Sequence, residues 1–218
     1  MLSYSLVPAK PAATHWCLVL HGLGDSRQGW MPVVPMLGVP GIGYALADAP
    51  RKYGDGFSWF DIHQDFSIDD AQVRESRAAL AELIRHLLER LGIASDRLFL
   101  MGFSQGCLMA IDAALRWPTP FAGVVGISGF MAMLVEYPAG FGAAAKDQRL
   151  LLTHGRQDPM IPLAFVGGQK DRLRKLGIHV DWREYDKVHT LDPSDELDDI
   201  RAFLRERMQA NPARPAPG

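Results

Sequence analysis

The sequence of 218 residues contains only two cysteines, Cys17 and Cys107. Both lie in apolar surroundings, without C-x-x-C spacing and without clustered histidines beside them. A disulfide framework, a redox motif and a cysteine-based metal site are therefore all disfavoured. We expect both cysteines to be buried and unpaired, because free cysteine packs as a small apolar residue.

The sequence also lacks an excess of charge of one sign and long apolar runs. The net charge is -2, from 23 basic and 25 acidic residues, so no basic surface for nucleic acid or an anionic membrane is expected. No apolar run approaches the roughly eighteen residues of a transmembrane helix. The first residues lack the basic start and apolar stretch of a signal peptide. These absences predict a cytoplasmic protein without a nucleic-acid partner and without a membrane span.

The chain is long enough and apolar enough to bury a hydrophobic core. Hydrophobic residues make up 48% of the sequence, and a chain of this length buries about 70% of its unfolded surface. We see no internal repeat and no linker, so residues 1–210 are expected to form one domain. Residues 211–218, rich in proline and alanine, are expected to be a disordered tail.

Apolar runs with the length of buried strands alternate with helical patterns. The runs are residues 16–20, 44–47, 98–101, 123–127, 150–153 and 179–185. The clearest helix, 71–91, repeats leucine and isoleucine on one face and ends at Gly92. Another begins with Asp192 as N-cap and Pro193 as its first residue. Strands apolar on both faces, separated by helices, predict an α/β fold whose mainly parallel sheet is covered on both sides.

The third apolar run leads directly into Gly102-Phe103-Ser104-Gln105-Gly106 and then into a helix-compatible segment. This order of strand, sharp turn and helix is the context that a G-x-S-x-G nucleophile elbow requires. The glycines allow a crowded turn in which positive φ is common. Ser104 is therefore the candidate nucleophile, and the alternative is a packing turn with an exposed serine.

Candidates for the base and the acid follow two later strands. A serine hydroxyl needs an imidazole to take its proton and a carboxylate to orient that imidazole. Asp158 follows the fifth run and His189 the sixth, so both fall where reactive loops of parallel sheets gather. The chain order of serine, acid and histidine is that of α/β hydrolases. The alternatives are a turn-shaping or helix-capping role for Asp158 and an exposed loop position for His189.

Acyl transfer also needs donors for the oxyanion, and backbone amides are the usual source. We expect them from Gln105, the residue after the nucleophile, and from Leu23 in the glycine loop after the first run. Phosphate binding by that loop is the alternative, although it lacks a complete P-loop or G-x-G-x-x-G pattern. His21 and His154, which stand beside glycines, are interpreted as loop-shaping side chains.

Taken together, these motifs resemble the acyl-protein thioesterase and carboxylesterase family of α/β hydrolases. Residues 20–25 with Trp30 are similar to the oxyanion loop of that family, and Ser58-Trp59-Phe60-Asp61 resembles its S-W-F-D loop. The elbow, Asp158-Pro159 and His189 complete a resemblance that covers roughly residues 3–207.

The resemblance implies a lidless serine hydrolase with the α/β-hydrolase fold and with no metal or organic cofactor. Its substrates would be small esters or thioesters with short, medium or long acyl chains, or acylated proteins and lysophospholipids. The oligomeric state is left open between a monomer and a homodimer. Trp59, Phe60 and Met160 would then bind substrate. From the residues alone, Trp59 and Phe60 could equally be core aromatics.

The sequence departs from the family at two places beside the site. Cys107 stands where the family usually has glycine, and it is expected to tighten helix packing behind Ser104. Val188 stands where glycine usually precedes the histidine, and valine adopts a positive φ only at a cost. Residues 129–135 are either a core segment or the wall of an acyl groove. Two rival functions remain: a lactone or dienelactone hydrolase, and a catalytically silent binding module.

Overall fold

The computed structural model describes residues 1–218 apart from 11, 64–66, 132–138 and 212–218. Within these residues seven strands form one sheet in the order β1-β3-β2-β6-β7-β8-β9, and every neighbouring pair is parallel except β1 with β3. The strands are β1 Tyr4–Val7, β2 His15–Leu20, β3 Ile42–Ala47, β6 Leu98–Phe103, β7 Gly123–Ile127, β8 Arg149–Gly155 and β9 His179–Tyr185. The six predicted strands and the mainly parallel sheet are confirmed.

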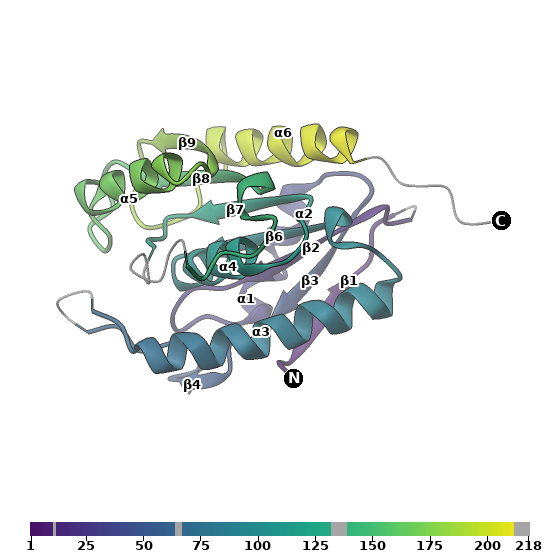
Figure 1. Cartoon of the computed structure of the whole chain (residues 1–218), viewed down its shortest axis with the longest axis horizontal. Coiled ribbons are helices and arrows are strands. Elements are labelled where there is room, and N and C mark those ends of the chain that lie inside the picture. Colours follow the sequence, from purple (N-terminus) through teal and green to yellow (C-terminus); the bar gives the residue numbers. More distant parts are fainter. Residues whose placement is uncertain (11, 64–66, 132–138, 212–218) are drawn as a thin grey trace.

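Helices lie on both faces of this sheet, with α3 and α6 on opposite sides in Figure 1. The helices are α1 Arg27–Trp30, α2 Val33–Leu37, α3 Asp70–Leu91, α4 Gln105–Arg116, α5 Leu163–Lys175 and α6 Asp195–Ala210, with short 3-10 turns η1 Ser95–Arg97 and η3 Ala145–Asp147. One apolar cluster joins the sheet to α3, α4 and α5, and a second joins it to α1, α2 and α6. In β2, Leu18 belongs to the first cluster and Val19 to the second. Strand β2 is apolar on both faces because both are covered.

The longest helix, α3, follows the sequence pattern closely. Its N-cap Asp69 accepts a hydrogen bond from the Gln72 amide at 3.0 Å, and it ends at Gly92 with φ 63°. Leu80, Ile84 and neighbouring apolar side chains form its fully buried face. The predicted helix 71–91 is therefore confirmed, with one more residue at its start.

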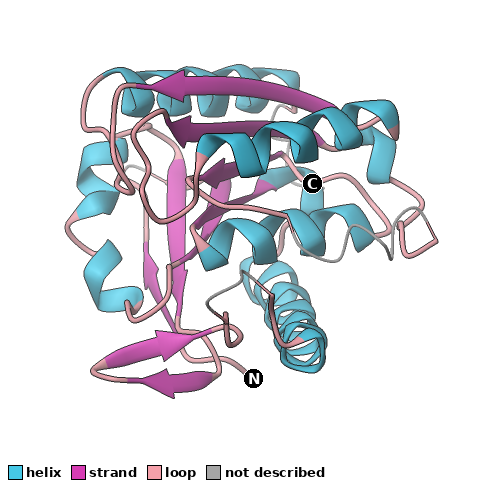
Figure 2. Ribbon diagram, turned by 90° about the vertical axis from the view of Figure 1, so that its left-hand side faces the viewer, coloured by secondary structure: helices cyan, strands magenta, loops and turns pink. Residues whose placement is uncertain are grey.

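Three short strands were not predicted from the sequence. Strand β1 joins the edge of the sheet antiparallel to β3, and its four residues are only half-buried. Strands β4 Arg51–Tyr53 and β5 Gly56–Ser58 form a separate hairpin, seen apart from the main sheet in Figure 2. Edge strands of this length carry too few buried residues to leave an apolar run in the sequence.

Two predictions at the C-terminal end need correction. Strand β9 is present, but exposed and half-buried residues alternate along it because it forms the edge of the sheet. Helix α6 begins at Asp195 with Ser194 as N-cap, whereas the sequence predicted Asp192. Asp192 Oδ1 instead accepts bonds from the Ser194 amide at 2.7 Å and hydroxyl at 2.6 Å, so this carboxylate stabilises the preceding turn.

Other predictions concern the termini and the membrane. The predicted tail 211–218 lies, apart from Asn211, outside the described residues. In the part of the chain that is described, no helix is both long and apolar enough to cross a membrane.

Candidate active site

Ser104 lies on the turn between β6 and α4, with φ 53° and ψ -114°. The sequence predicts positive φ at the glycines of this turn, but the residue with positive φ is the serine itself. The glycines are required for space. A Cβ on Gly102 would collide with the backbone carbonyl of Gly106, and a Cβ on Gly106 would collide with that of Leu20. Close backbone contact therefore holds Ser104 in a strained conformation, as a nucleophile elbow requires.

The side chains of Ser104, His189 and Asp158 form one chain of hydrogen bonds. His189 Nε2 lies 3.1 Å from Ser104 Oγ, and His189 Nδ1 lies 2.7 Å from Asp158 Oδ2. Because a carboxylate only accepts, Nδ1 carries the proton and Nε2 is free to accept from the serine hydroxyl. The His189 side chain is 18% exposed, so it does not occupy an open loop position. The three sequence-predicted residues are thus brought together.

The Asp158 carboxylate has two functions in the structure. Its Oδ2 accepts from His189, while its Oδ1 accepts from the backbone amides of Met160 and Ile161, each at 2.9 Å. The turn-shaping contacts and the contact with the imidazole occur together, so the structural interpretation of Asp158 does not exclude the catalytic one. The side chain is completely buried, so these amides hold the carboxylate that orients the imidazole.

The two predicted oxyanion donors lie at the carboxyl ends of neighbouring parallel strands, β2 and β6. Gln105 is the first residue of α4, so its amide has no acceptor within the helix. Gly22, next to Leu23, approaches the elbow so closely that a Cβ there would lie 3.3 Å from Ser104 Cβ. Among the described residues, neither the Leu23 nor the Gln105 amide forms a backbone hydrogen bond. Both therefore stay candidate oxyanion donors.

Trp59 and Phe60, which were expected to bind substrate, lie in the core and not in the wall of the cavity at Ser104. Both are fully buried. Their backbone is tied to the elbow instead: the Trp59 amide donates to Gln105 Oε1 at 3.0 Å, and Gln105 Nε2 donates to the Phe60 carbonyl at 2.6 Å. The alternative of core aromatics describes them better, and their backbone supports the elbow through the Gln105 side chain.

Two buried histidines support the loops of the site. His21 donates from Nδ1 to the Gly22 carbonyl at 2.6 Å and accepts from the Ala49 amide at 3.0 Å. His154 donates from Nε2 to the Ile161 carbonyl at 2.8 Å. Burial lowers the pKa of both imidazoles, so they are neutral near pH 7. The loop-shaping role inferred from the sequence is confirmed for both.

A cavity of about 560 Å³ opens beside Ser104 and His189. Its remaining wall is mostly apolar and includes Leu23, Phe130 and Met160. Met160 is 61% exposed and lies at the surface of the cavity, where the sequence predicted a substrate contact. Of residues 129–135, Phe130 lines this cavity and also belongs to the core, whereas residues 132–135 lie outside the described residues.

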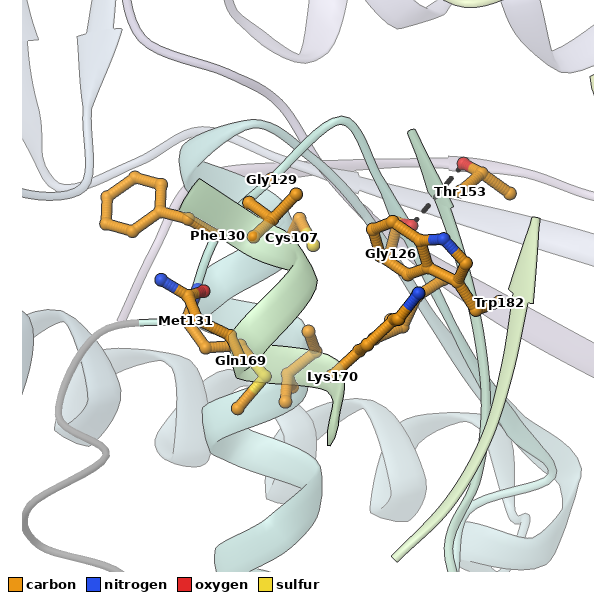
Figure 3. Close-up of a pocket in the computed structure, with 12 residues that line it drawn as sticks. Cys107, Gly126, Gly129, Phe130, Met131, Thr153, Gln169, Lys170 and Trp182 are labelled. Atoms are coloured by element: carbon orange, nitrogen blue, oxygen red, sulfur yellow. Dashed lines mark hydrogen bonds between the residues drawn. The ribbon is translucent and has the colours of Figure 1, made fainter. Parts of the chain in front are cut away.

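Cys107 packs directly behind the elbow, in the first turn of α4. Figure 3 shows it beside Gly126 and Gly129, at a cavity of only about 20 Å³. A Cβ on Gly126 would come within 2.6 Å of the Cys107 sulfur, so the glycine makes room for the thiol. Burial raises the pKa of Cys107 to about 12, so it is a thiol and not a thiolate. Both cysteines are free and buried, as the sequence predicted.

The backbone strain expected at Val188 does not occur. Among the described residues other than glycine, only Ser104 and Ser128 have a positive φ. Valine is therefore accommodated before His189 without a left-handed conformation, and its side chain is 50% exposed. Within the described ranges, no group of three or more His, Cys, Asp or Glu side chains is arranged to hold a metal ion.

Sequence comparison places these features in a known family. Residues 4–208 match the phospholipase/carboxylesterase family model. Acyl-protein thioesterase 1 of Schizosaccharomyces pombe is 35% identical over 165 residues, covering 70% of this chain and 73% of that protein. Acyl-protein thioesterase 1 of Yarrowia lipolytica is 27% identical over 219 residues, covering 93% of this chain and 96% of that protein.

Solved structures agree with this placement. Esterase PE8 is similar with a TM-score of 0.86 and 26% identity, covering 94% of this chain and 98% of that chain. A carboxylesterase from Mesorhizobium loti has a TM-score of 0.81 at 21% identity, covering 94% of each chain, and supports the fold. The resemblance drawn from the motifs is confirmed. This chain belongs to the phospholipase/carboxylesterase family of serine hydrolases with the α/β-hydrolase fold.

Proposed function

We propose that the protein hydrolyses carboxylic esters and thioesters through an acyl-enzyme intermediate on Ser104. The observation that carries the proposal is the hydrogen-bonded chain from Ser104 through His189 to Asp158, with distances of 3.1 Å and 2.7 Å. A hydroxyl, an imidazole in the accepting tautomer and a buried carboxylate are the three groups that nucleophilic acyl transfer needs.

In the first half of the reaction, Ser104 Oγ attacks the carbonyl carbon while His189 Nε2 takes the serine proton. The negative charge that forms on the carbonyl oxygen accepts hydrogen bonds from the Leu23 and Gln105 amides. The tetrahedral intermediate then collapses, and the leaving alcohol or thiol takes the proton from His189. The acyl group remains on Ser104.

In the second half, His189 removes a proton from water, and the resulting nucleophile attacks the acyl-serine carbonyl. The same two amides stabilise the second oxyanion. Collapse releases the carboxylic acid and returns the proton to Ser104. Asp158 orients His189 and stabilises its protonated form in both halves.

The kind of acyl group and leaving group that the protein accepts is also part of the proposal. The apolar wall of the cavity, with Leu23, Phe130 and Met160, favours an acyl chain over a polar acyl group. The two relatives named acyl-protein thioesterase 1 support thioesters, including acylated proteins, as substrates. Lysophospholipids are a further proposed class of substrate. A cytoplasmic location is also proposed, and it agrees with the two unpaired cysteines. The protein is proposed to be a monomer or a homodimer, and size-exclusion chromatography distinguishes these two states.

Covalent labelling tests this function most directly. A fluorophosphonate probe is expected to label the native chain and to leave Ser104→Ala unlabelled. Ser128→Ala is the matched control, because Ser128 is also a serine at positive φ near the site, and it should stay labelled. A native chain that is neither labelled nor active on any p-nitrophenyl ester from acetate to palmitate, or on an acyl thioester, would be a silent binding module.

A further inference from the structure

A buried ion pair lies two residues before His189, and the reaction steps above do not use it. The Lys187 ammonium donates to both oxygens of the Glu196 carboxylate at 2.6 Å and to the Thr190 carbonyl at 2.7 Å. The Lys187 side chain is 4% exposed and that of Glu196 is fully buried. Three donor contacts satisfy all three ammonium protons.

These contacts fix the chain both before and after His189. Lys187 precedes it, Thr190 follows it, and Glu196 lies in the first turn of α6. Glu196 also accepts from the Asp192 amide at 2.8 Å, so its carboxylate holds the chain after the histidine as well. Among the described residues, His189 itself forms no backbone hydrogen bond to another backbone group. The position of its backbone therefore depends on its neighbours.

The backbone of Lys187 also connects the histidine loop to the aspartate loop. Its carbonyl accepts from the Gln157 amide at 3.2 Å, next to Asp158 in sequence. Gly155, at the end of β8, approaches so closely that any Cβ there would collide with the same carbonyl. One residue thus contacts the chain on either side of His189, helix α6 and the loop that carries Asp158.

Stability alone is a weak reason for such a pair. Burial lowers the pKa of the Lys187 ammonium, and the Glu196 carboxylate opposes that shift. Apolar residues of similar volume often stabilise a protein as well as a buried ion pair does, because the pair loses its hydration. What apolar residues cannot supply is a directed bond to the Thr190 carbonyl.

We propose that the Lys187–Glu196 pair positions His189 relative to Ser104 and Asp158, so that Lys187 is a positioning residue for the proposed hydrolysis. The inference rests on the proposed function. The ammonium has no contact with the reacting atoms. It acts through the backbone on either side of the imidazole.

The test uses the full-length double variant Lys187→Met/Glu196→Gln. Methionine keeps the length of the lysine stem, and glutamine keeps an oxygen that accepts from the Asp192 amide. Removing both charges together avoids an uncompensated buried ion. We expect kcat for a p-nitrophenyl ester to fall about ten- to hundredfold, because small displacements of a catalytic group have effects of that size. KM should stay within about threefold, because the pair does not line the cavity.

A second readout reports the imidazole position without turnover. The Nδ1 proton that His189 donates to Asp158 should give a downfield proton resonance in the native chain. We expect that signal to broaden or disappear in the double variant. Leu204→Ala is the matched control for lost stability, because Leu204 is fully buried on the same helix and lies about two turns after Glu196. It should lower the melting temperature and keep both kcat and the resonance.

Glu196→Gln alone is a milder second variant, because it keeps an acceptor for Lys187 and removes only the charge. We expect its kcat to fall about threefold or more, since charge-assisted hydrogen bonds are roughly twice as strong as neutral ones. Native kcat and a native resonance in the double variant, or in Glu196→Gln if the double variant does not fold, would overturn the positioning role. A native chain that turns over no ester would instead overturn the proposed function, so the two failures are distinguishable.

Discussion

The nucleophile and the histidine of the site are held in different ways. Ser104 lies between an interior strand and the helix that follows it, and tight backbone contacts at Gly102 and Gly106 determine its conformation. His189 follows the edge strand β9, and side-chain bonds to Asp158 and the Lys187–Glu196 pair surround it.

The two halves of the site are therefore sensitive to different kinds of substitution. Backbone packing around Ser104 leaves no room for an added methyl group, whereas polar side-chain contacts dominate around His189. Substitutions that add volume should therefore damage the serine side most. Substitutions that remove a polar group should damage the histidine side most.

The largest effect is expected when the histidine side loses its base. His189→Ala should lower kcat by about 10⁴-fold or more, as the loss of one member of such a triad does. Steady-state turnover of a p-nitrophenyl ester measures it. Combining His189→Ala with Ser104→Ala should cause little further loss, because the two act as a unit. Two independent, multiplying losses would show that the residues do not work together.

A large effect on stability is expected on the serine side. Gly106→Ala should lower the free energy of unfolding by about 2–3 kcal/mol, because its Cβ meets the Leu20 carbonyl and backbone cannot easily move away. Gly168→Ala is the matched control: this exposed glycine of α5 has open space at the Cβ position, so the change should stabilise by about 0.5–1 kcal/mol. Urea unfolding measures both. Equal effects in the two variants would contradict the crowded elbow.

A smaller effect should appear as a dependence of stability on pH. It involves one buried histidine near Ser104 and one near Asp158. Burial lowers the folded-state pKa of His21 on the serine side and of His154 on the acid side. Below about pH 6.5 the unfolded chain binds protons that the folded chain does not, so stability falls as pH falls. Each histidine contributes at most about 1.4 kcal/mol per pH unit.

Urea unfolding between pH 7.5 and 5 tests this dependence. His21→Gln and His154→Gln should each reduce the slope, because each removes a buried imidazole of lowered pKa. A slope that neither buried variant alters would mean that other groups cause the loss of stability.

The smallest effect is expected from the side chain of Leu23, the residue whose backbone amide is a proposed oxyanion donor. Leu23→Ala keeps the backbone amide, so kcat should change by less than about threefold. Because the Leu23 side chain lines the cavity, KM for longer acyl esters should rise. A fall in kcat of a hundredfold would show that the amide depends on the leucine side chain for its position.

Much of the serine side could be predicted because it is encoded locally. The apolar run, the two glycines and the following helix lie within a short stretch, and each expresses a backbone preference or a pattern of burial. The same holds for α3, whose leucine and isoleucine repeat and Gly92 end were found correctly. Even here the sequence did not reveal that Ser104, and not a glycine, takes the positive φ.

The histidine side was predicted less completely. The chain order indicated Asp158 and His189, but the pairing of Lys187 with Glu196 left no periodic signal. Helix α6 was predicted to start at Asp192, yet that carboxylate stabilises a turn and the Asp192 amide donates to Glu196. Which of several polar neighbours pair depends on how the loops pack, and short-range patterns do not record it.

The sequence alone was enough to predict the α/β class, six of the strands in their order along the chain, the serine on its glycine-flanked turn and the family. These follow from local backbone preferences and from burial of apolar runs, which neighbouring residues encode. It took the packing of the folded chain to place Trp59 and Phe60 in the core and to bring a buried lysine into contact with the chain on both sides of His189. Those outcomes depend on which distant groups share one low-dielectric space, where each polar atom must find a partner.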